Sequence, residues 1–308
     1  MVNKTNKLKQ VEEVKLDGHV HVFSNSRSKA NVWWRDSGSR RLVDLIEQVK
    51  KSGINCVGLT NAGDDWLYER FVSQVDDLPN DWGYYQDERV TQVLDRDGIP
   101  CIFFKAEELF TKEGHMLIWG TQFGQMFQPV ANLKEYEEKV SKEFRIDDIL
   151  DEIERDTILT KISDHTFYRG GLGETGELEK RKHRFDAYEW NASTSEEANG
   201  LVWINAHGKP VVCNSDAHRL KDIGKAYQKF VGRLNFDSGK DFIASLRENV
   251  RQNKIDERYT EMLPFGAFLH HAYMILVDHK FGLYDKDVET DDFNIDEEKL
   301  ALKIRCEI

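Results

Sequence analysis

Short apolar runs alternate with amphipathic stretches along most of this chain, the pattern of strands joined by helices. Helical periodicity predicts helices over residues 40–53, 87–98, 145–155 and 238–252. Continuous apolar runs predict buried strands over residues 12–19, 54–60, 99–109, 115–120, 157–163, 185–190, 209–214 and 230–235. This alternation is typical of a parallel sheet with crossover helices, either open or closed into a barrel.

The C-terminal part of the chain continues the pattern less regularly. Residues 257–280 are predicted to be mostly helical, and the acidic residues 287–298 are predicted to be a loop. Residues 302–308 alternate apolar and polar side chains, which predicts a terminal strand. Such a strand needs a neighbour, either in the same chain or in a partner subunit.

Histidines and carboxylates follow two of the predicted strands. LDGHVHVF (16–23) places His19 and His21 two residues apart, so on a strand both imidazoles point the same way and can bind one metal ion. Asp17 could orient His19 by accepting its second ring N–H. CNSDAHRL (213–220) repeats the two-residue spacing with Asp216 and His218. One such pair is weak evidence for a metal, but two pairs at strand ends strengthen it.

The polar residues gather at one end of the predicted strands. In a (β/α) barrel the C-terminal ends of the strands share one rim, which is where active sites are built. Residues about 200 apart in the sequence would then meet at one place. The side chains at these strand ends are His19, Glu108, His165, Asp216 and His218.

Composition limits the class of protein. The chain has 308 residues, of which 40% are hydrophobic and 32% charged, as in an ordinary globular protein. The net charge of -12 argues against a general nucleic-acid coat protein, although a nuclease with a locally positive cleft remains possible. Residues 1–15 lack the apolar core of a signal peptide, and no run approaches the ~18 apolar residues of a membrane helix. The four cysteines form no CxxC pair. We therefore expect a cytoplasmic protein with buried thiols and no membrane contact.

Four strings taken together resemble the PHP (polymerase and histidinol phosphatase) family, in the family's order over residues 14–235. They are LDGHVH, EELFTKEGHMLIWG, SDHTFY and NSDAH. The resemblance implies a distorted seven-stranded (β/α) barrel over residues 1–235, with two or three metal ions at its rim. Residues 236–308 would form a mostly helical extension of the same domain. The activity implied is hydrolysis of phosphate esters by a metal-activated water.

The resemblance also implies a set of metal ligands. His19, His21, Glu108 and Asp216 would hold one ion, and Glu108 would bridge to a second ion shared with His115 and His165. Glu108 is preferred to Glu107 because the family's glutamate and histidine are seven residues apart. Mixed imidazole and carboxylate ligands suit Zn, Mn or Fe, and the sequence does not choose among them.

This sequence departs from the family at its third metal site. Asn61 and Ala62 stand where the family has an Asp-His pair, and Asn25 stands where another ligand is expected. Alanine cannot bind a metal, and neutral asparagine is a poor substitute for a carboxylate. His218 would be the one remaining metal ligand of this third site. We therefore expect two divalent ions, with His218 acting instead beside Glu108 and Asp216 as a general acid or a phosphate contact.

Three functions stay open. A nucleic-acid or nucleotide phosphodiesterase is slightly favoured, because Trp33 and Trp34 could stack on the bases of a single strand beside Arg27, Lys29 and Arg35, which could contact its phosphates. A histidinol-phosphatase-like phosphomonoesterase is the second. The third is a non-catalytic module that docks to another protein, such as an ATPase or a nucleic-acid enzyme. A homo-oligomer is a further possible assembly.

Other polar residues have two interpretations each. Glu189 and Asn191 could line the site or face solvent. The run KRKHR (180–184) could attract phosphates or form a solvated loop. His270 and His271 lie in an apolar stretch and are predicted to be core or interface residues.

Overall fold

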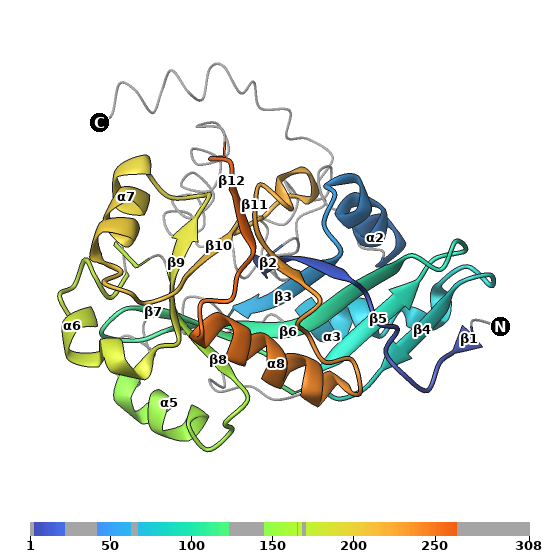
Figure 1. Ribbon diagram of the computed structural model, residues 1–308, viewed down its shortest axis with the longest axis horizontal. Coiled ribbons are helices and arrows are strands. Elements are labelled where there is room, and N and C mark those ends of the chain that lie inside the picture. The colour runs from blue at the N-terminus through green and yellow to red at the C-terminus, as the bar shows by residue number, and fades with distance from the viewer. Residues whose placement is uncertain are drawn as a thin grey trace, which may run out of the picture.

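The computed structural model describes residues 3–21, 42–62, 67–122, 145–164, 166–167 and 171–263. These residues form one mixed sheet with helices against its outer faces (Figure 1). Several predictions lie outside the described residues: the ligand His165, the substrate contacts Arg27, Lys29 and Arg35, the tryptophans Trp33 and Trp34, Asn25, His270, His271, and everything predicted for residues 264–308.

The sheet is barrel-like and mixed in direction. Parallel pairing joins β2 to β3 to β6 and β8 to β9 to β10, whereas β7 runs antiparallel to β6 and β8, and β11 runs antiparallel to β2 and β12. The order is β10-β9-β8-β7-β6-β3-β2-β11-β12. These strands are β2 (Glu13–Val20), β3 (Cys56–Ala62), β6 (Pro100–Phe110), β7 (His115–Trp119), β8 (Thr160–Ser163), β9 (Ala187–Asn191), β10 (Val211–Asn214), β11 (Ala226–Val231) and β12 (Glu257–Thr260).

The predicted α/β barrel fold is thus confirmed, but it is neither wholly parallel nor limited to seven strands. A side branch of β1 (Asn3–Lys4), β4 (Gly83–Gln86) and β5 (Val90–Leu94) joins the sheet at β6. The eleven-residue β6 is long enough to pair with β5 along its first half and with β7 along its second.

The helix predicted over residues 87–98 is wrong, because Val90–Leu94 forms β5. Asp87 and Asp95 each accept backbone N–H groups at the two ends of this strand and so build its turns. Thr91 and Gln92 are buried with partners: the Thr91 hydroxyl bonds Tyr68 Oη, and the Gln92 amide bonds the backbone of Lys9. Pairing with neighbouring strands therefore overrides the helical spacing of the apolar residues.

Two further boundaries differ from prediction. The strand predicted over 230–235 begins earlier, as β11, and ends at Val231 because Gly232 adopts a φ of 61°. Residues 257–260, predicted as helix, form β12 against β11.

Helices pack on the outside of the sheet, with α5, α6 and α7 along one side and α2 along another (Figure 1). The helix predicted over residues 40–53 is confirmed as α2, and the apolar side chains that give it helical periodicity, Leu42, Leu45, Ile46 and Val49, are buried. The helices are α2 (Leu42–Lys51), α3 (Leu67–Val72), α5 (Ile146–Ile153), α6 (Leu178–Arg181), α7 (Glu196–Asn205) and α8 (Gly239–Arg251), with short 3-10 turns η1 (Val75–Asp77), η2 (Lys182–Arg184) and η3 (Leu220–Asp222).

Side-chain amides hold β10 against β2 and β11, where no ladder pairs the strands. Buried Gln228 on β11 accepts a hydrogen bond from Cys213 N (2.7 Å) and donates to Leu16 O (2.9 Å). Asn214 Oδ1 accepts from Gly18 N (2.9 Å). These bonds bring the end of β10 beside the end of β2, so the two conspicuous sequence pairs meet.

Candidate metal centre

The ends of β2 and β10 are joined by backbone hydrogen bonds. His21 N donates to Ala217 O (2.8 Å), and Ala217 N donates to His19 O (3.3 Å). Asp216, just before this contact, has a φ of 50°, a left-handed conformation that aspartate adopts more readily than most residues. This local geometry places the side chains of His19, His21 and Asp216 together.

These three side chains form the centre of a buried cluster. Their exposed fractions are 0%, 5% and 3% for His19, His21 and Asp216. The two Nε2 atoms of the histidines lie 2.8 Å apart. Asp216 Oδ1 is 3.7 Å from His19 Nε2 and 3.9 Å from His21 Nε2. One ligand atom from each residue therefore lies within 4.8 Å of the others, close enough to surround one metal ion.

Glu108 on β6 faces this cluster with both oxygens. Oε2 is 3.2 Å from His21 Nε2, and Oε1 is 3.6 Å from His115 Nδ1, at the start of β7. Glu107 points to the other face of β6, where it lies 3.3 Å from the buried ammonium of Lys105. The structure thus brings Glu108, not Glu107, to the histidines, with one oxygen toward each side.

Asp164 belongs to the cluster although sequence reasoning did not single it out. It directly follows β8, is fully buried, and its Oδ1 lies 3.6 Å from His19 Nδ1. His19, Glu108 and Asp164 form a second group whose ligand atoms lie within 4.8 Å of one another. The signal was present in SDHTFY, where Asp164 also ends a strand, but only the neighbouring histidine was considered.

The carboxylate that orients His19 is Glu189 on β9, not Asp17. Glu189 Oε1 lies 2.9 Å from His19 Nδ1 and also accepts a hydrogen bond from Asn214 Nδ2 (2.7 Å). A carboxylate only accepts, so a proton sits on Nδ1, and Nε2 is the atom that would face a metal ion in the cluster. Asn191 donates to the other oxygen of Glu189 (3.1 Å), which places both residues at the site instead of in solvent.

Asp17 faces away because the register of β2 shifts between Asp17 and Val20. A bulge of this kind breaks the two-residue alternation on which the Asp17 prediction depended. Asp17 instead accepts hydrogen bonds from Ser215 N (3.0 Å) and Gly224 N (2.9 Å). Burial raises the pKa of Asp17 to about 6, although the hydrogen bonds from Ser215 and Gly224 oppose that rise.

His218 lies at the edge of the cluster. Its Nε2 is 3.2 Å from Asp216 Oδ1, and its ring stacks on His21 with centroids 5.0 Å apart. The side chain of His218 is 23% exposed, whereas His19 is fully buried. Ser193 Oγ donates to the other oxygen of Asp216 (2.6 Å) and so fixes that carboxylate. His218 is therefore placed where a molecule entering from solvent could touch it.

The protein environment shifts the pKa values of the cluster in opposite directions. Burial disfavours charge on His19, but Glu189 and Asp164 outweigh it and raise the pKa of His19 well above its usual value. Burial lowers the pKa of His21.

The pKa values of two carboxyl groups in the cluster also shift in opposite directions. Burial opposes charge on Glu108, yet contacts with the imidazoles hold its pKa well below the usual range. Burial and the nearby Glu189 raise the pKa of Asp164. These carboxylates are packed out of water, so a cation among them is strongly favoured. Imidazole nitrogen and carboxylate oxygen are the ligands of divalent transition metals, and the donor set fits them.

Asn61 is turned away from the cluster. Its Oδ1 accepts from Tyr68 N (3.1 Å) at the start of α3, and its Nδ2 donates to Glu69 Oε2 (3.1 Å). The side chain that replaces a family ligand therefore supports α3 instead.

Comparison with known proteins supports the family resemblance. A family model described as PHP-associated matches residues 198–250, the segment that contains Asp216 and His218. The resemblance to the PHP family is thus confirmed over this segment. No curated protein matches the sequence.

Three solved structures were found to match this chain. PsfC from Pseudomonas syringae PB-5123 is 13% identical, with a TM-score of 0.53 over 87% of this chain and 99% of that one. Endonuclease Q, bound to a 27-mer duplex substrate with an abasic lesion, is 18% identical with a TM-score of 0.45 over 80% of this chain and 58% of that one. A two-domain protein from Bacteroides vulgatus ATCC 8482, containing a predicted PHP-like metal-dependent phosphoesterase, is 13% identical with a TM-score of 0.45 over 85% and 70%. At 13% identity the likeness to PsfC concerns the fold alone.

No helix within the described residues is both long enough and apolar enough to cross a membrane.

Proposed function

We propose that this chain, which resembles the PHP family, is a metal-dependent phosphoesterase. One observation carries the proposal: His19 is shared by two buried groups of ligand atoms, one with His21 and Asp216 and the other with Glu108 and Asp164. A purely structural cluster would not place so many carboxylates and imidazoles out of water without neutralising them.

The residues divide between two candidate metal positions. His19, His21, Asp216 and one oxygen of Glu108 surround the first position. The other oxygen of Glu108 and His115 lie toward the second, which the family resemblance would complete with His165. Two divalent ions there would acidify a water molecule and neutralise charge on a phosphate. Asp164 is a further candidate ligand for either ion.

Neighbouring residues hold the ligands in place. Glu189 accepts the Nδ1 proton of His19 and keeps its Nε2 available. Ser193 donates to Asp216 and leaves its Oδ1 pointing at the histidines. His218, half-buried beside Asp216, is placed to donate a proton to a leaving oxygen.

Within this class we favour phosphodiesters of nucleic acids or nucleotides as substrates. One support is the expected loss of a third metal ion. Ala62 has no metal-binding group, and the Asn61 side chain bonds to Tyr68 and Glu69 of α3. A second support is the sequence of the segment after β2, which combines Trp33 and Trp34 with Arg27, Lys29 and Arg35. Aromatic rings and cations together suit the bases and phosphates of a single strand.

Hydrolysis of two chromogenic esters tests the proposal. The metal-loaded protein should cleave bis-(p-nitrophenyl) phosphate faster than p-nitrophenyl phosphate. Asp216→Asn should lower the rate by several orders of magnitude, because losing a charged ligand weakens the bound metal. Asp237→Asn, which changes an exposed carboxylate on the chain before α8, is the matched control and should leave the rate unchanged.

The other outcomes separate the alternatives. Faster hydrolysis of the monoester would replace the diesterase with a phosphatase. Tight metal binding with neither ester cleaved would contradict catalysis and favour a docking module.

A further inference from the structure

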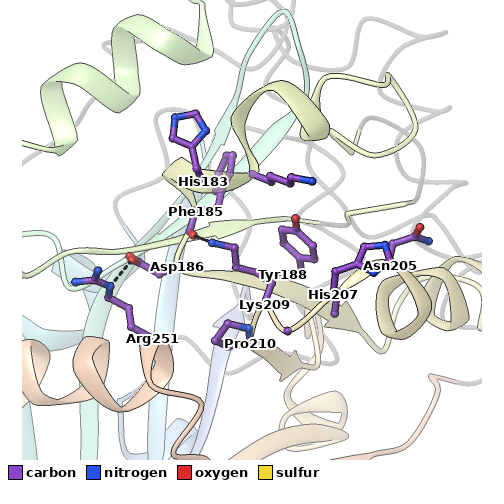
Figure 2. Close-up of a pocket in the computed structure, with 12 residues that line it drawn as sticks. His183, Phe185, Asp186, Tyr188, Asn205, His207, Lys209, Pro210 and Arg251 are labelled. Atoms are coloured by element: carbon purple, nitrogen blue, oxygen red, sulfur yellow. Dashed lines mark hydrogen bonds and ion pairs between the residues drawn. The ribbon is translucent and has the colours of Figure 1, made fainter.

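A cavity lies outside the sheet, where β9 and β10 begin. Its volume is about 510 Å³, within the range of small-molecule sites. It lies between η2, the end of α7, the turn before β10 and the end of α8 (Figure 2). The metal-centre residues Asn191 and Asp216 lie at or beyond the opposite ends of β9 and β10, a strand length of roughly 15 Å away. The two sites are therefore separate.

Three cationic and two imidazole side chains lie among the twelve residues of the cavity wall. Figure 2 shows Lys209 between Asp186 and Tyr188, with His183 and His207 at different edges of the cavity. Lys182 and Arg251 add two further cations, of which Lys182 also pairs with Glu179 (2.7 Å) and Arg251 with Asp186 (3.4 Å). This local excess of positive charge contrasts with the net charge of -12 of the whole chain, so it marks the cavity as a place for an anion.

Lys209 is the cation most in need of a counter-ion. One N–H of its ammonium donates to Phe185 O (2.8 Å), which holds the side chain in the cavity and leaves its other donors available. Within the described part of the chain no carboxylate lies within ion-pair distance of Lys209. Burial lowers the pKa of Lys209, which means that its charged form is poorly solvated and that a nearby anion would stabilise it.

The one carboxylate in the cavity wall is already neutralised. Asp186 pairs with Arg247 (3.1 Å) and with Arg251 (3.4 Å), and it also accepts a hydrogen bond from Lys161 N (3.0 Å). Asp186 is therefore shared among several partners and offsets the charge of Lys209 only in part, and it holds the Arg251 guanidinium at the cavity (Figure 2).

The run KRKHR contributes to this cavity in part only. Arg181 and Arg184 turn to α5, where both pair with Asp147, so they anchor the segment. Lys182 and His183 turn to the cavity. The run is thus neither a fully solvated loop nor placed beside the metal centre.

We propose that this cavity binds a small organic phosphate, up to the size of a nucleoside monophosphate, through Lys209 and Arg251. A phosphate has enough oxygens to accept from donors on different elements, and Lys209 lies just before β10 whereas Arg251 ends α8. The cavity volume exceeds that of a bare phosphate and leaves room for the organic part. The proposal does not depend on the metal centre or on its activity.

Isothermal titration of the metal-loaded protein with adenosine 5′-monophosphate tests the proposal. Binding should be detected, and Lys209→Ala should weaken it by roughly tenfold or more, the effect of losing a charged hydrogen-bond donor. Arg251→Ala, at an exposed position that does not support the core, should weaken it as well. Lys51→Ala, an exposed lysine at the end of α2, is the charge-matched control and should bind as the wild type does.

A second readout separates this cavity from the metal centre, where a phosphate ester could also bind. The imidazole NMR signals of His183 and His207, assigned through His→Gln variants, should shift on addition of adenosine 5′-monophosphate and not of adenosine. The same shifts with adenosine would show that the phosphate is not what binds. Unmoved signals, or equal affinity of Lys209→Ala, Arg251→Ala and wild type, would overturn the proposal.

Discussion

His19 is the residue on which both candidate ligand groups depend, and Glu189 decides its protonation. With Glu189 Oε1 at 2.9 Å from Nδ1, the imidazole keeps a proton on Nδ1 and leaves Nε2 as the atom that a metal ion would bind. Asn191 and Asn214 hold the carboxylate from both sides. The affinity of the centre for metal therefore depends on a residue that need not touch the metal.

We predict that Glu189→Gln lowers metal affinity by about 10- to 100-fold, because an amide can offer its NH₂ to His19 and favour the wrong tautomer. Competition with a chromogenic chelator measures this affinity. Glu179→Gln, at an exposed position on α6, supplies the control and should leave affinity unchanged. Equal affinities for wild type and Glu189→Gln would show that Glu189 does not position His19.

At the residue scale, part of the cluster could be predicted and part could not. The histidine and aspartate pairs at 19–21 and 216–218 meet because both follow strands. Asp17 was misassigned because a bulge near Gly18 breaks the alternation, and a sequence does not reveal a bulge. Glu189 and Asn191 gain their roles only when β9 lies beside β10, a contact between elements that local patterns do not encode.

At the scale of elements, the close approach of β2 to Trp119 on β7 requires a glycine at position 18. A Cβ atom on Gly18 would lie 2.2 Å from Cζ2 of Trp119, a fully buried ring in the core cluster that includes Leu16 and Phe104. We predict that Gly18→Ala destabilises the protein by about 1–3 kcal/mol through overpacking.

Urea unfolding measures this change, and Gly200→Ala is the matched control. Gly200 lies on α7 with open space around it, so alanine there should be neutral or stabilising by up to about 1 kcal/mol. If the two variants unfold alike, the close approach of Gly18 to Trp119 is not what limits this strand.

The contact between β10 and β11 depends on Gln228. Replacing it by leucine leaves Cys213 N and Leu16 O buried without their partner. We predict a loss of about 1–3 kcal/mol in the free energy of unfolding. Gln252→Leu, on the exposed end of α8, should change it little. Equal stability of the two variants would mean that water replaces the lost bonds.

The elements themselves were mostly predictable, and the failures have physical causes. Buried strands such as β3 and β6 stand out as continuous apolar runs between helices. β5 does not, since Val90, Val93 and Leu94 have helical spacing while Thr91 and Gln92 are buried through hydrogen bonds formed only in the fold. β12 is an edge strand with little burial, so its sequence carries no apolar signal.

At the scale of the whole molecule, the buried carboxylates link metal binding to stability. Glu108, Asp164, Glu189 and Asp216 are buried close together, and without a metal ion their charges are offset only by protonation of groups such as His19 and Asp164, whose pKa values are raised. Removing metal with a chelator should therefore lower the melting temperature, and restoring it should reverse the change. Asp216→Asn should show a smaller chelator effect, because it has one charge less and binds metal weakly. A melting temperature that does not move while metal is demonstrably removed would contradict this link.

Anomalous diffraction from crystals of the metal-loaded protein tests the central claim most directly. The account predicts two peaks, one among His19, His21 and Asp216 and a second toward His115, with Glu108 between them. Peaks absent from this cluster, or three fully occupied peaks within it, would contradict the account.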